Sequence, residues 1–336
     1  MTYPVKGNGH CAKGISCVTP GWVRGGPVVS AGLGTLALSG AYGPVGPREA
    51  DRLVRRALDA GVTLLDTAGF YADGQVESLI GRVLAGRAGE VVVCTRGGAR
   101  AGGPGGPFVF DGRPHELERS LHASLRRLRT DCVDLFSLHC QDTRVPVERS
   151  VAGLAELVRA GKIRRLGLSG GTAEQVRRAH AVHAVSAIGV EYSLWGPRPS
   201  PELLATAREL GIAVIAARPL GRGFLTGRVR PQAGFEPDDW RRADPRFHPD
   251  HRRSSCPRLQ ELESVAAQLD LGAGRVALSW LFAQGEHVVP VPSTRDPVHL
   301  EMNLAASSVE LPPETLGKLD DLFPAARHAR SASPLL

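Results

Sequence analysis

Short apolar runs rich in β-branched residues alternate with longer amphipathic segments along most of this chain, and this alternation limits the folds open to it. Alternating strands and helices are typical of a parallel sheet, because each helix returns the chain to the start of the next strand. The eight predicted strands lie near residues 28–34, 62–66, 91–95, 133–138, 164–169, 186–190, 212–216 and 287–291. The predicted helices lie near 48–60, 75–85, 114–129, 147–161, 173–183, 200–210, 258–285 (broken at "LGAG") and 297–306.

The number of these units favours a single α/β domain closed on itself. Eight strand–helix units in 336 residues fit a (β/α)8 TIM barrel better than an open doubly wound sheet. No predicted strand leads directly into a GxGxxG loop that opens a helix, which counts against a Rossmann domain. We expect the barrel over residues 21–326, beginning with a small hairpin at 21–31, a loose extension at 1–20 and a tail at 327–336.

Composition indicates a globular protein that needs no membrane. The chain is 42% hydrophobic and 22% charged, which suits a soluble fold. No apolar run approaches the roughly 20 residues that span a bilayer, and the N-terminus has no apolar signal-peptide core. We therefore expect a cytoplasmic protein. Its six cysteines include no CxxC pair, which favours reduced thiols over disulfides.

The positive charge is carried almost entirely by arginine. The formal net charge is +7, with a local concentration in "WRRADPRFHPDHRR" at 240–253. Such a segment suits nucleic acid, a phosphorylated small molecule, or an ordinary solvated loop. Because no nucleic-acid-binding motif accompanies it, we do not expect a nucleic-acid partner.

Two long segments follow predicted strands. Residues 97–114 are rich in glycine and proline, and residues 218–256 form a long insertion. Loops of this length in a compact domain are usually functional lids or disordered. Both follow the carboxyl ends of strands, which form the active face of a barrel.

Polar side chains stand where three successive predicted strands end. Asp66 ends the second strand, Arg96 the third and His139 the fourth, and Tyr71 follows Asp66 by five residues. Neighbouring strand ends meet at one rim, so we expect Asp66 to pair with Arg96 and this cation to lower the pKa of Tyr71. Each residue alone is ordinarily structural. Together they would provide a proton donor and an oxyanion site, which suits carbonyl reduction by hydride transfer from a cofactor.

Motifs along most of the chain resemble one known family. They are "GLGT" (32–35), "LLDTAGFYADGQVESLIG" (64–81), "LHCQD" (138–142), "AGKIRRLGLSG" (160–170), "VEYSLW" (190–195), "RPLGRGFLTG" (218–227), "DPRF" (244–247) and "VVPVPSTRDPVHLEMNLAA" (288–306). In order and spacing the chain is similar to the aldo-keto reductases, most of all the branch with bacterial general reductases and potassium-channel β-subunits. The resemblance implies a (β/α)8 barrel that binds NADPH (NADP+) without a Rossmann domain.

The resemblance also implies catalytic roles. The family tetrad is Asp, Tyr, Lys and His, and here Asp66, Tyr71 and His139 match three of its positions. By resemblance Tyr71 is the general acid, His139 orients the carbonyl, and Asp66 anchors a cation. Arg96 stands in the lysine position, where it keeps the charge but is larger, forked and always protonated.

Cofactor contacts follow from the same resemblance. We expect them from Thr35, Leu36, Asp66, Ser169, Gly170, Gly189, Tyr192, Arg218, Pro219, Leu220, Gly221, Ser293, Thr294, Arg295, His299 and Asn303. Four positions depart from the family pattern: Gly189 replaces a glutamine, Arg218 a serine, His299 an arginine and Met302 a glutamate. We expect NADPH to be preferred over NADH, by less than is usual in the family.

Three functions remain open from the sequence. The first is NADPH-dependent reduction of an aldehyde or ketone to an alcohol. The second is a barrel repurposed as a lyase, dehydratase or isomerase that uses Tyr71 as acid or base. The third is a non-catalytic regulatory subunit, against which the retained Tyr71 and His139 argue. No metal site is expected, and the substrate and oligomeric state are not indicated.

Overall fold

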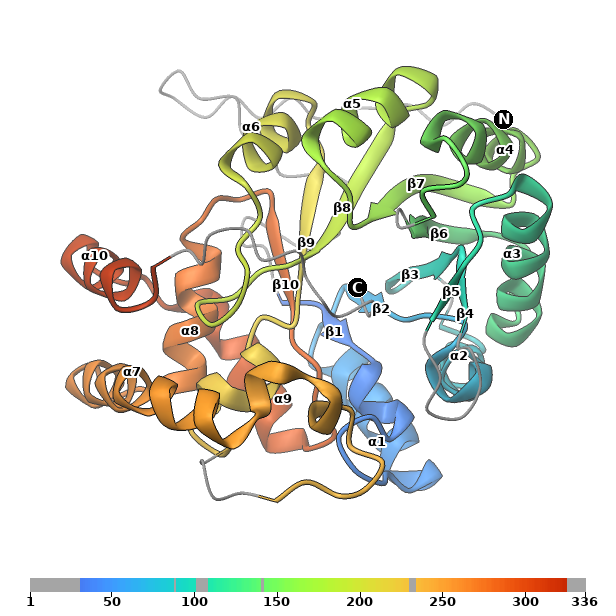
Figure 1. The fold of residues 1–336 in the computed structure, drawn as a ribbon. Helices are drawn as coiled ribbons and strands as arrows, with labels where there is room; N and C mark the ends of the chain where they lie inside the picture. The colour runs from blue at the N-terminus through green and yellow to red at the C-terminus, as the bar shows by residue number, and fades with distance from the viewer. Residues whose placement is uncertain (1–30, 88, 101–107, 140–141, 230–233, 325–336) are drawn as a thin grey trace.

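A computed structural model describes residues 31–87, 89–100, 108–139, 142–229 and 234–324. Within these ranges eight parallel strands form one sheet in the order β1-β2-β3-β6-β7-β8-β9-β10. Figure 1 shows the strands around a common centre, with the helices outside them. This arrangement confirms the predicted (β/α)8 TIM barrel. The strands are β1 (Leu33–Gly34), β2 (Leu64–Asp66), β3 (Val92–Gly97), β6 (Val133–His139), β7 (Ile163–Ser169), β8 (Val185–Glu191), β9 (Ala213–Ala217) and β10 (Val288–Val291).

The barrel closes between its first and last strands. The amide of Gly32 donates to the carbonyl of Pro290 at 3.0 Å, and that of Gly34 to Pro292 at 3.1 Å. Gly34 also pairs with Ser293 as a parallel bridge. A Cβ atom on Gly34 would lie 2.6 Å from the carbonyl oxygen of Val291, so this seam requires glycine at position 34.

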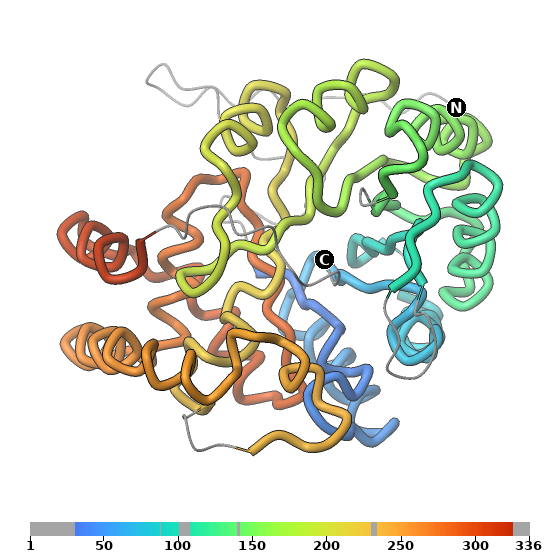
Figure 2. Tube along the Cα trace, viewed as in Figure 1, coloured from blue at the N-terminus to red at the C-terminus, as the bar shows by residue number. Residues whose placement is uncertain are grey.

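Helices cover the outside of the barrel, as the tube in Figure 2 also shows. They are α1 (Pro47–Asp59), α2 (Gln75–Val83), α3 (Pro114–Leu128), α4 (Val147–Arg159), α5 (Ala173–Val182), α6 (Pro201–Glu209), α7 (Pro249–Gln268), α8 (Ala273–Phe282), α9 (Pro297–Leu304) and α10 (Pro313–Leu322). Two differ from the prediction. The helix predicted from residue 258 begins earlier, at Pro249, so that Pro257 lies inside α7 and not before its start. The last helix, α10, was not predicted.

Alternation along the strands produces two apolar layers. One set of strand side chains faces the outer helices; it includes Leu65, Val93 and Phe136. The other set fills the barrel interior as a separate cluster of Leu64, Val92, Cys94, Leu135, Ala187, Ala213, Ile215, Val289 and Val291. The next inward position on each strand therefore lies at the carboxyl rim.

The two long segments after strands contain more structure than the sequence indicates. After β3, the short strands β4 (Ala99–Arg100) and β5 (Val109–Phe110) pair antiparallel; the residues between them, 101–107, lie outside the described ranges. After β9 come the 3-10 helices η3 (Gly221–Thr226), η4 (Trp240–Ala243) and η5 (Pro245–Phe247), and then the first turns of α7. Shorter 3-10 helices, η1 (Leu36–Ser39), η2 (Tyr71–Gly74) and η6 (Ala305–Ser308), follow β1, β2 and α9.

Several expectations concern residues that the structure does not describe. The extension at 1–20, most of the hairpin at 21–31 and nearly all of the tail fall there. Of the cysteines in the described ranges, Cys94, Cys132 and Cys256 are free thiols. Over the same ranges, none of the helices combines the length and the apolar character that crossing a bilayer requires.

Candidate active site

Strand register brings the predicted polar residues to one rim. Asp66 follows Leu64 inward on β2, and Arg96 follows Cys94 inward on β3. His139 ends β6 opposite Ser169 of β7, and Ser169 is in turn opposite Gly189 of β8. The strands therefore hold these positions side by side at the carboxyl end of the barrel.

Asp66 and Arg96 form a buried ion pair. Each residue is 5% exposed, and Nη2 of Arg96 donates to both carboxylate oxygens of Asp66, at 2.5 Å to Oδ2. The other donors of the guanidinium are also used: Nη1 reaches Oγ of Ser169 at 3.1 Å and Nε the carbonyl of Thr67 at 3.3 Å. The predicted pair thus forms, and both of its contacts come from Nη2 of Arg96.

The charge of Arg96 is secure. Burial opposes that charge, but the adjacent Asp66 carboxylate outweighs burial and holds the pKa of the guanidinium above its usual value. Arg96 is therefore a fixed cation across the whole range in which a protein is folded. It cannot act as a proton relay.

Tyr71 lies in η2, just beyond the end of β2, and is 7% exposed. Burial raises the pKa of its phenol to about 12, although Arg96 acts in the opposite direction. The expectation that the cation lowers this pKa below its reference value is therefore wrong in its net direction. The cation limits the rise, and burial decides the sign. Tyr71 is a protonated donor at neutral pH.

His139 is buried beneath an aromatic ring. The residue is 1% exposed, and its ring centroid lies 5.0 Å from that of Phe110 on β5. The hairpin of β4 and β5 thus lies over the end of β6. Four other aromatic rings contact one another in sequence. Phe70 packs edge-on against both Tyr71 and Phe108, and Phe108 packs against Trp240.

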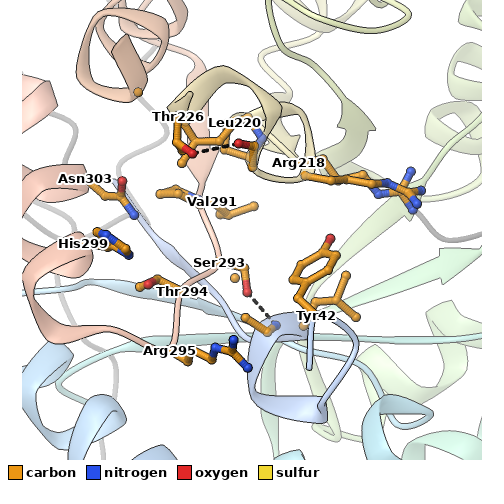
Figure 3. A pocket seen from close by; sticks show the side chains of 18 of the residues that line it. Tyr42, Arg218, Leu220, Thr226, Val291, Ser293, Thr294, Arg295, His299 and Asn303 are labelled. Carbon is orange, nitrogen blue, oxygen red and sulfur yellow. Dashed lines mark hydrogen bonds between the residues drawn. The ribbon is translucent and has the colours of Figure 1, made fainter. Parts of the chain in front are cut away.

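A cavity of about 330 Å³ connects this rim with the loops after β9 and β10, a size typical of small-molecule sites. Figure 3 shows Tyr42 and Arg218 at one end of the cavity and His299 and Asn303 at the other. The predicted site residues that line it are Thr35, Leu36, Asp66, Tyr71, Arg96, Arg218, Pro219, Leu220, Ser293, Thr294, Arg295, His299 and Asn303, with Met302 beside them.

The remaining predicted residues do not line this cavity: His139, Ser169, Gly170, Gly189, Tyr192 and Gly221. Ser169 is bonded to Arg96. Tyr192 donates its hydroxyl to Gln284 at 3.1 Å. At Gly189 an added Cβ would meet nothing closer than 3.8 Å, so there is open space where the family carries a glutamine.

The far end of the cavity is built by β10 and α9. Oγ of Ser293 accepts the amide of Ala37 at 2.7 Å, and Nη1 of Arg295 donates to the carbonyl of Pro44 at 2.9 Å. Burial and the nearby Arg228 lower the pKa of His299 below its usual value. His299 is therefore a neutral imidazole at pH 7.

Arg218 connects the cavity to a buried ion network. Its Nη1 donates to Glu191 at 2.6 Å, and the second oxygen of Glu191 accepts from Arg246 at 2.5 Å. Arg246 continues to Asp244 at 2.8 Å, which also pairs with Arg222 at 3.1 Å. Glu191 ends β8 and the other residues follow β9, so this network fixes the insertion to the barrel.

Tyr42, Arg222 and Arg241 are among the cavity residues that were not assigned from the sequence. Tyr42 follows β1 at the same rim as Tyr71, and this position was the available signal for it. Arg241 lies over the Tyr42 ring at 5.1 Å from its centroid. Trp195, at the end of the motif "VEYSLW", stacks on Phe224 in the core, with ring centroids 4.0 Å apart.

Residues 31–323 match the sequence profile of the aldo/keto reductase family. This match spans most of the chain, and the chain belongs to that family. The departures at Arg96 and Gly189 are therefore differences within it.

Particular relatives agree with this assignment. The aldo-keto reductase str7 of Strobilurus tenacellus is 36% identical over 318 residues, which cover 91% of this chain and 92% of that protein. The glycerol dehydrogenase AKR11B4 from Gluconobacter oxydans has the same fold, with a TM-score of 0.78 at 27% identity over 90% of this chain and 94% of that one. An aldo-keto reductase from Klebsiella pneumoniae, solved in complex with NADPH, is similar in fold, with a TM-score of 0.69 at 23% identity over 89% and 93% of the two chains.

Proposed function

We propose that this protein reduces an aldehyde or ketone to the alcohol with NADPH, and that Tyr71 is the general acid. The observation that carries the proposal is that a protonated phenol and a fixed cation line one cavity together with the predicted adenosine contacts. Membership of the aldo/keto reductase family supports it.

The cavity residues fit NADPH by the chemistry of their donors. Ser293, Thr294, Arg295 and Asn303 offer hydroxyl, guanidinium and amide groups for the adenosine phosphate, with neutral His299 beside them. The segment 218–221 would follow the pyrophosphate with its main chain. At the nicotinamide end, the hydroxyl of Ser169 accepts from Arg96 and keeps its own proton to donate. The open space at Gly189 leaves this end with fewer contacts.

NADPH, when bound, would supply the hydride. The Tyr71 hydroxyl would donate its proton to the carbonyl oxygen, and Arg96 would stabilise the negative charge that develops there. Asp66 holds Arg96 in place. His139 would orient the carbonyl from the end of β6. Phe70, which packs against Tyr71, and Phe108 and Trp240 beyond it would provide apolar surface that excludes water.

Replacement of Tyr71 by phenylalanine tests the proposal. Tyr71→Phe removes one oxygen and should lower kcat for aldehyde reduction by about 10²–10⁴, while thermal unfolding and NADPH binding remain similar. Tyr192→Phe is the matched comparison, because it removes a hydroxyl that bonds Gln284 and keeps the ring. Its loss should be much smaller.

Three outcomes separate the functions considered. Turnover lost in Tyr71→Phe with NADPH still bound supports the reductase. A protein that binds no NADPH and consumes no carbonyl compound is not a reductase, and a lyase or isomerase would then be sought with the same Tyr71. Near-normal reduction by Tyr71→Phe would remove Tyr71 from the catalytic role.

A further inference from the structure

Cations dominate the wall of the cavity. Of the described residues, one carboxylate lines it, that of Asp66, and this group already pairs with Arg96. Glu191, Asp244 and Asp239 pair with Arg218, Arg222 and Arg241, and none of these three carboxylates lines the cavity. The arginines of the wall are Arg96, Arg218, Arg222, Arg228, Arg241, Arg275 and Arg295.

Arg218 lines this cavity and has an unused hydrogen-bond donor. Its side chain is only 5% exposed, and while Nη1 bonds Glu191, Nη2 is buried and has no hydrogen-bond partner in the described part of the chain. Arg218 also adopts a left-handed backbone conformation with φ of 52°. A buried unpaired guanidinium N–H and a strained backbone both cost stability, and both are typical of ligand-binding positions.

Tyr42 supplies a second donor. Figure 3 shows its hydroxyl pointing toward the Arg218 side chain. Burial raises the pKa of Tyr42, while Arg222 and Arg218 act against this rise, so the phenol keeps its proton. One guanidinium N–H and one phenol O–H, from two residues that line the same cavity, match the two oxygens of a carboxylate.

An anion here would also relieve repulsion between neighbouring cations. Burial and the adjacent Arg218 lower the pKa of Arg222 to about 10. Arg218 also acts on the pKa of Tyr71, so these groups lie close to the proposed acid. The predicted adenosine contacts are at the other end of the cavity (Figure 3). The unused donors therefore belong to the substrate end.

We propose that Arg218 and Tyr42 bind a carboxylate on the substrate, so that the chain reduces a carbonyl compound that also carries a carboxylate. This inference rests on the proposed reductase function and names its substrate class. In this assignment the main chain of the 218–221 segment faces the cofactor, and the guanidinium of Arg218 faces the substrate.

Matched aldehydes test the proposal. Para-carboxybenzaldehyde and its methyl ester form a rigid pair, and succinic semialdehyde and its methyl ester a flexible one. The native protein should show a higher kcat/KM for the acid than for the ester in at least one pair. Arg218→Met keeps the side-chain length and the same backbone demand but removes the donor. It should lower the acid-to-ester ratio by about 10- to 100-fold, as expected for a hydrogen bond to a charged group.

Arg228→Met is the matched control, because Arg228 lines the same cavity and lies near His299 at the other end. It should alter NADPH binding and leave the acid-to-ester ratio as it is. Equal losses on acid and ester in Arg218→Met, accompanied by weaker NADPH binding, would assign Arg218 to the cofactor and overturn the proposal.

A second variant and the native protein itself also test the carboxylate site. If Arg218→Met does not fold, Arg218→Lys keeps the charge without the fork and should give a ratio between the native and neutral values. The native protein alone also decides: reduction of both esters without preference for either acid would refute the carboxylate site and leave the reductase function intact. Absence of all reduction would instead refute the proposed function.

Discussion

At the scale of single residues, Arg96 is the main departure from the family tetrad. Its guanidinium reaches Asp66, Thr67 and Ser169 at once. A lysine at this position has one nitrogen, so it would keep the ion pair with Asp66 and release Ser169. The extra bond to Ser169 thus couples the Arg96 cation to a residue expected to hold the cofactor.

Arg96→Lys should therefore retain carbonyl reduction or increase it, and should bind NADPH more tightly. Arg96→Met is the control: it removes the charge near Tyr71 and should lower kcat by about 10²-fold or more. Steady-state kinetics and fluorescence titration of NADPH measure both effects. A sharp loss of the native reaction in Arg96→Lys would show that the forked geometry itself is required.

The buried phenol predicts an unusual pH dependence. The pKa of Tyr71 is about 12, and the acid form that donates the proton is present below the pKa. Reduction should therefore show no loss due to Tyr71 up to about pH 10. The reverse oxidation requires the phenolate, so its rate should rise about tenfold per pH unit over the same range. A pH profile with an apparent pKa below 8 for reduction would contradict this assignment.

The sequence predicted which residues meet at the rim, but not their protonation. Spacing along strands is sufficient to align Asp66, Arg96 and His139, because inward positions repeat every second residue. The pKa of Tyr71 depends on how much of the surrounding chain covers it. Likewise, the bond between Arg218 and Glu191 joins residues 27 apart in sequence, and nothing in either local pattern indicates it.

At the scale of elements, the seam between β1 and β10 brings two stretches of backbone into close contact. Gly34→Ala would place a Cβ 2.6 Å from the carbonyl oxygen of Val291. We expect a loss of about 1–3 kcal/mol in the free energy of unfolding, measured by urea denaturation. The affinity for NADPH should fall with it, because the adjacent Ser293 bridges to Ala37.

Gly317→Ala is the control for this change. Gly317 lies in α10, and no atom approaches within 4 Å of the Cβ that alanine would add. Alanine is favoured over glycine inside a helix by about 0.5–1 kcal/mol, so this variant should be slightly more stable. If Gly34→Ala were equally harmless, the seam would not be as tight as the structure indicates.

The elements were predicted correctly where the apolar pattern of the sequence was clear. They were missed where a proline lies inside a helix or where few apolar residues anchor the element. All eight strands were located from apolar runs alone. In α7, Pro257 lies inside a 20-residue helix, and a sequence reading places it at a start, which is the usual position of proline. The α10 helix is anchored by few apolar residues, among which Leu319 is buried, so its periodicity was too weak to recognise.

At the scale of the whole molecule, the insertion after β9 is joined to the barrel through Glu191. This carboxylate is buried between Arg218 and Arg246, and burial opposes its ionisation while the two arginines lower its pKa. Because both ends of the network are buried, its loss would affect the shape of the cavity and not only local charge.

Glu191→Gln should thus cost about 3–5 kcal/mol of stability, since it leaves buried cations without their partner. Hydrogen exchange should rise mainly in residues 218–256. Glu209→Gln serves as the control, because Glu209 pairs with Arg177 at the surface and such pairs contribute about 0–1 kcal/mol. Unchanged exchange in the insertion of Glu191→Gln would show that other contacts hold it.

The joining of the first and last strands also has a consequence during synthesis. Ser293, which holds the amide of Ala37, follows it by 256 residues. At about 5–20 residues per second, a ribosome needs roughly 13–50 s to produce the partner of β1. Throughout that interval the edge of β1 is unpaired and open to association with other chains, and the floor of the cavity is incomplete.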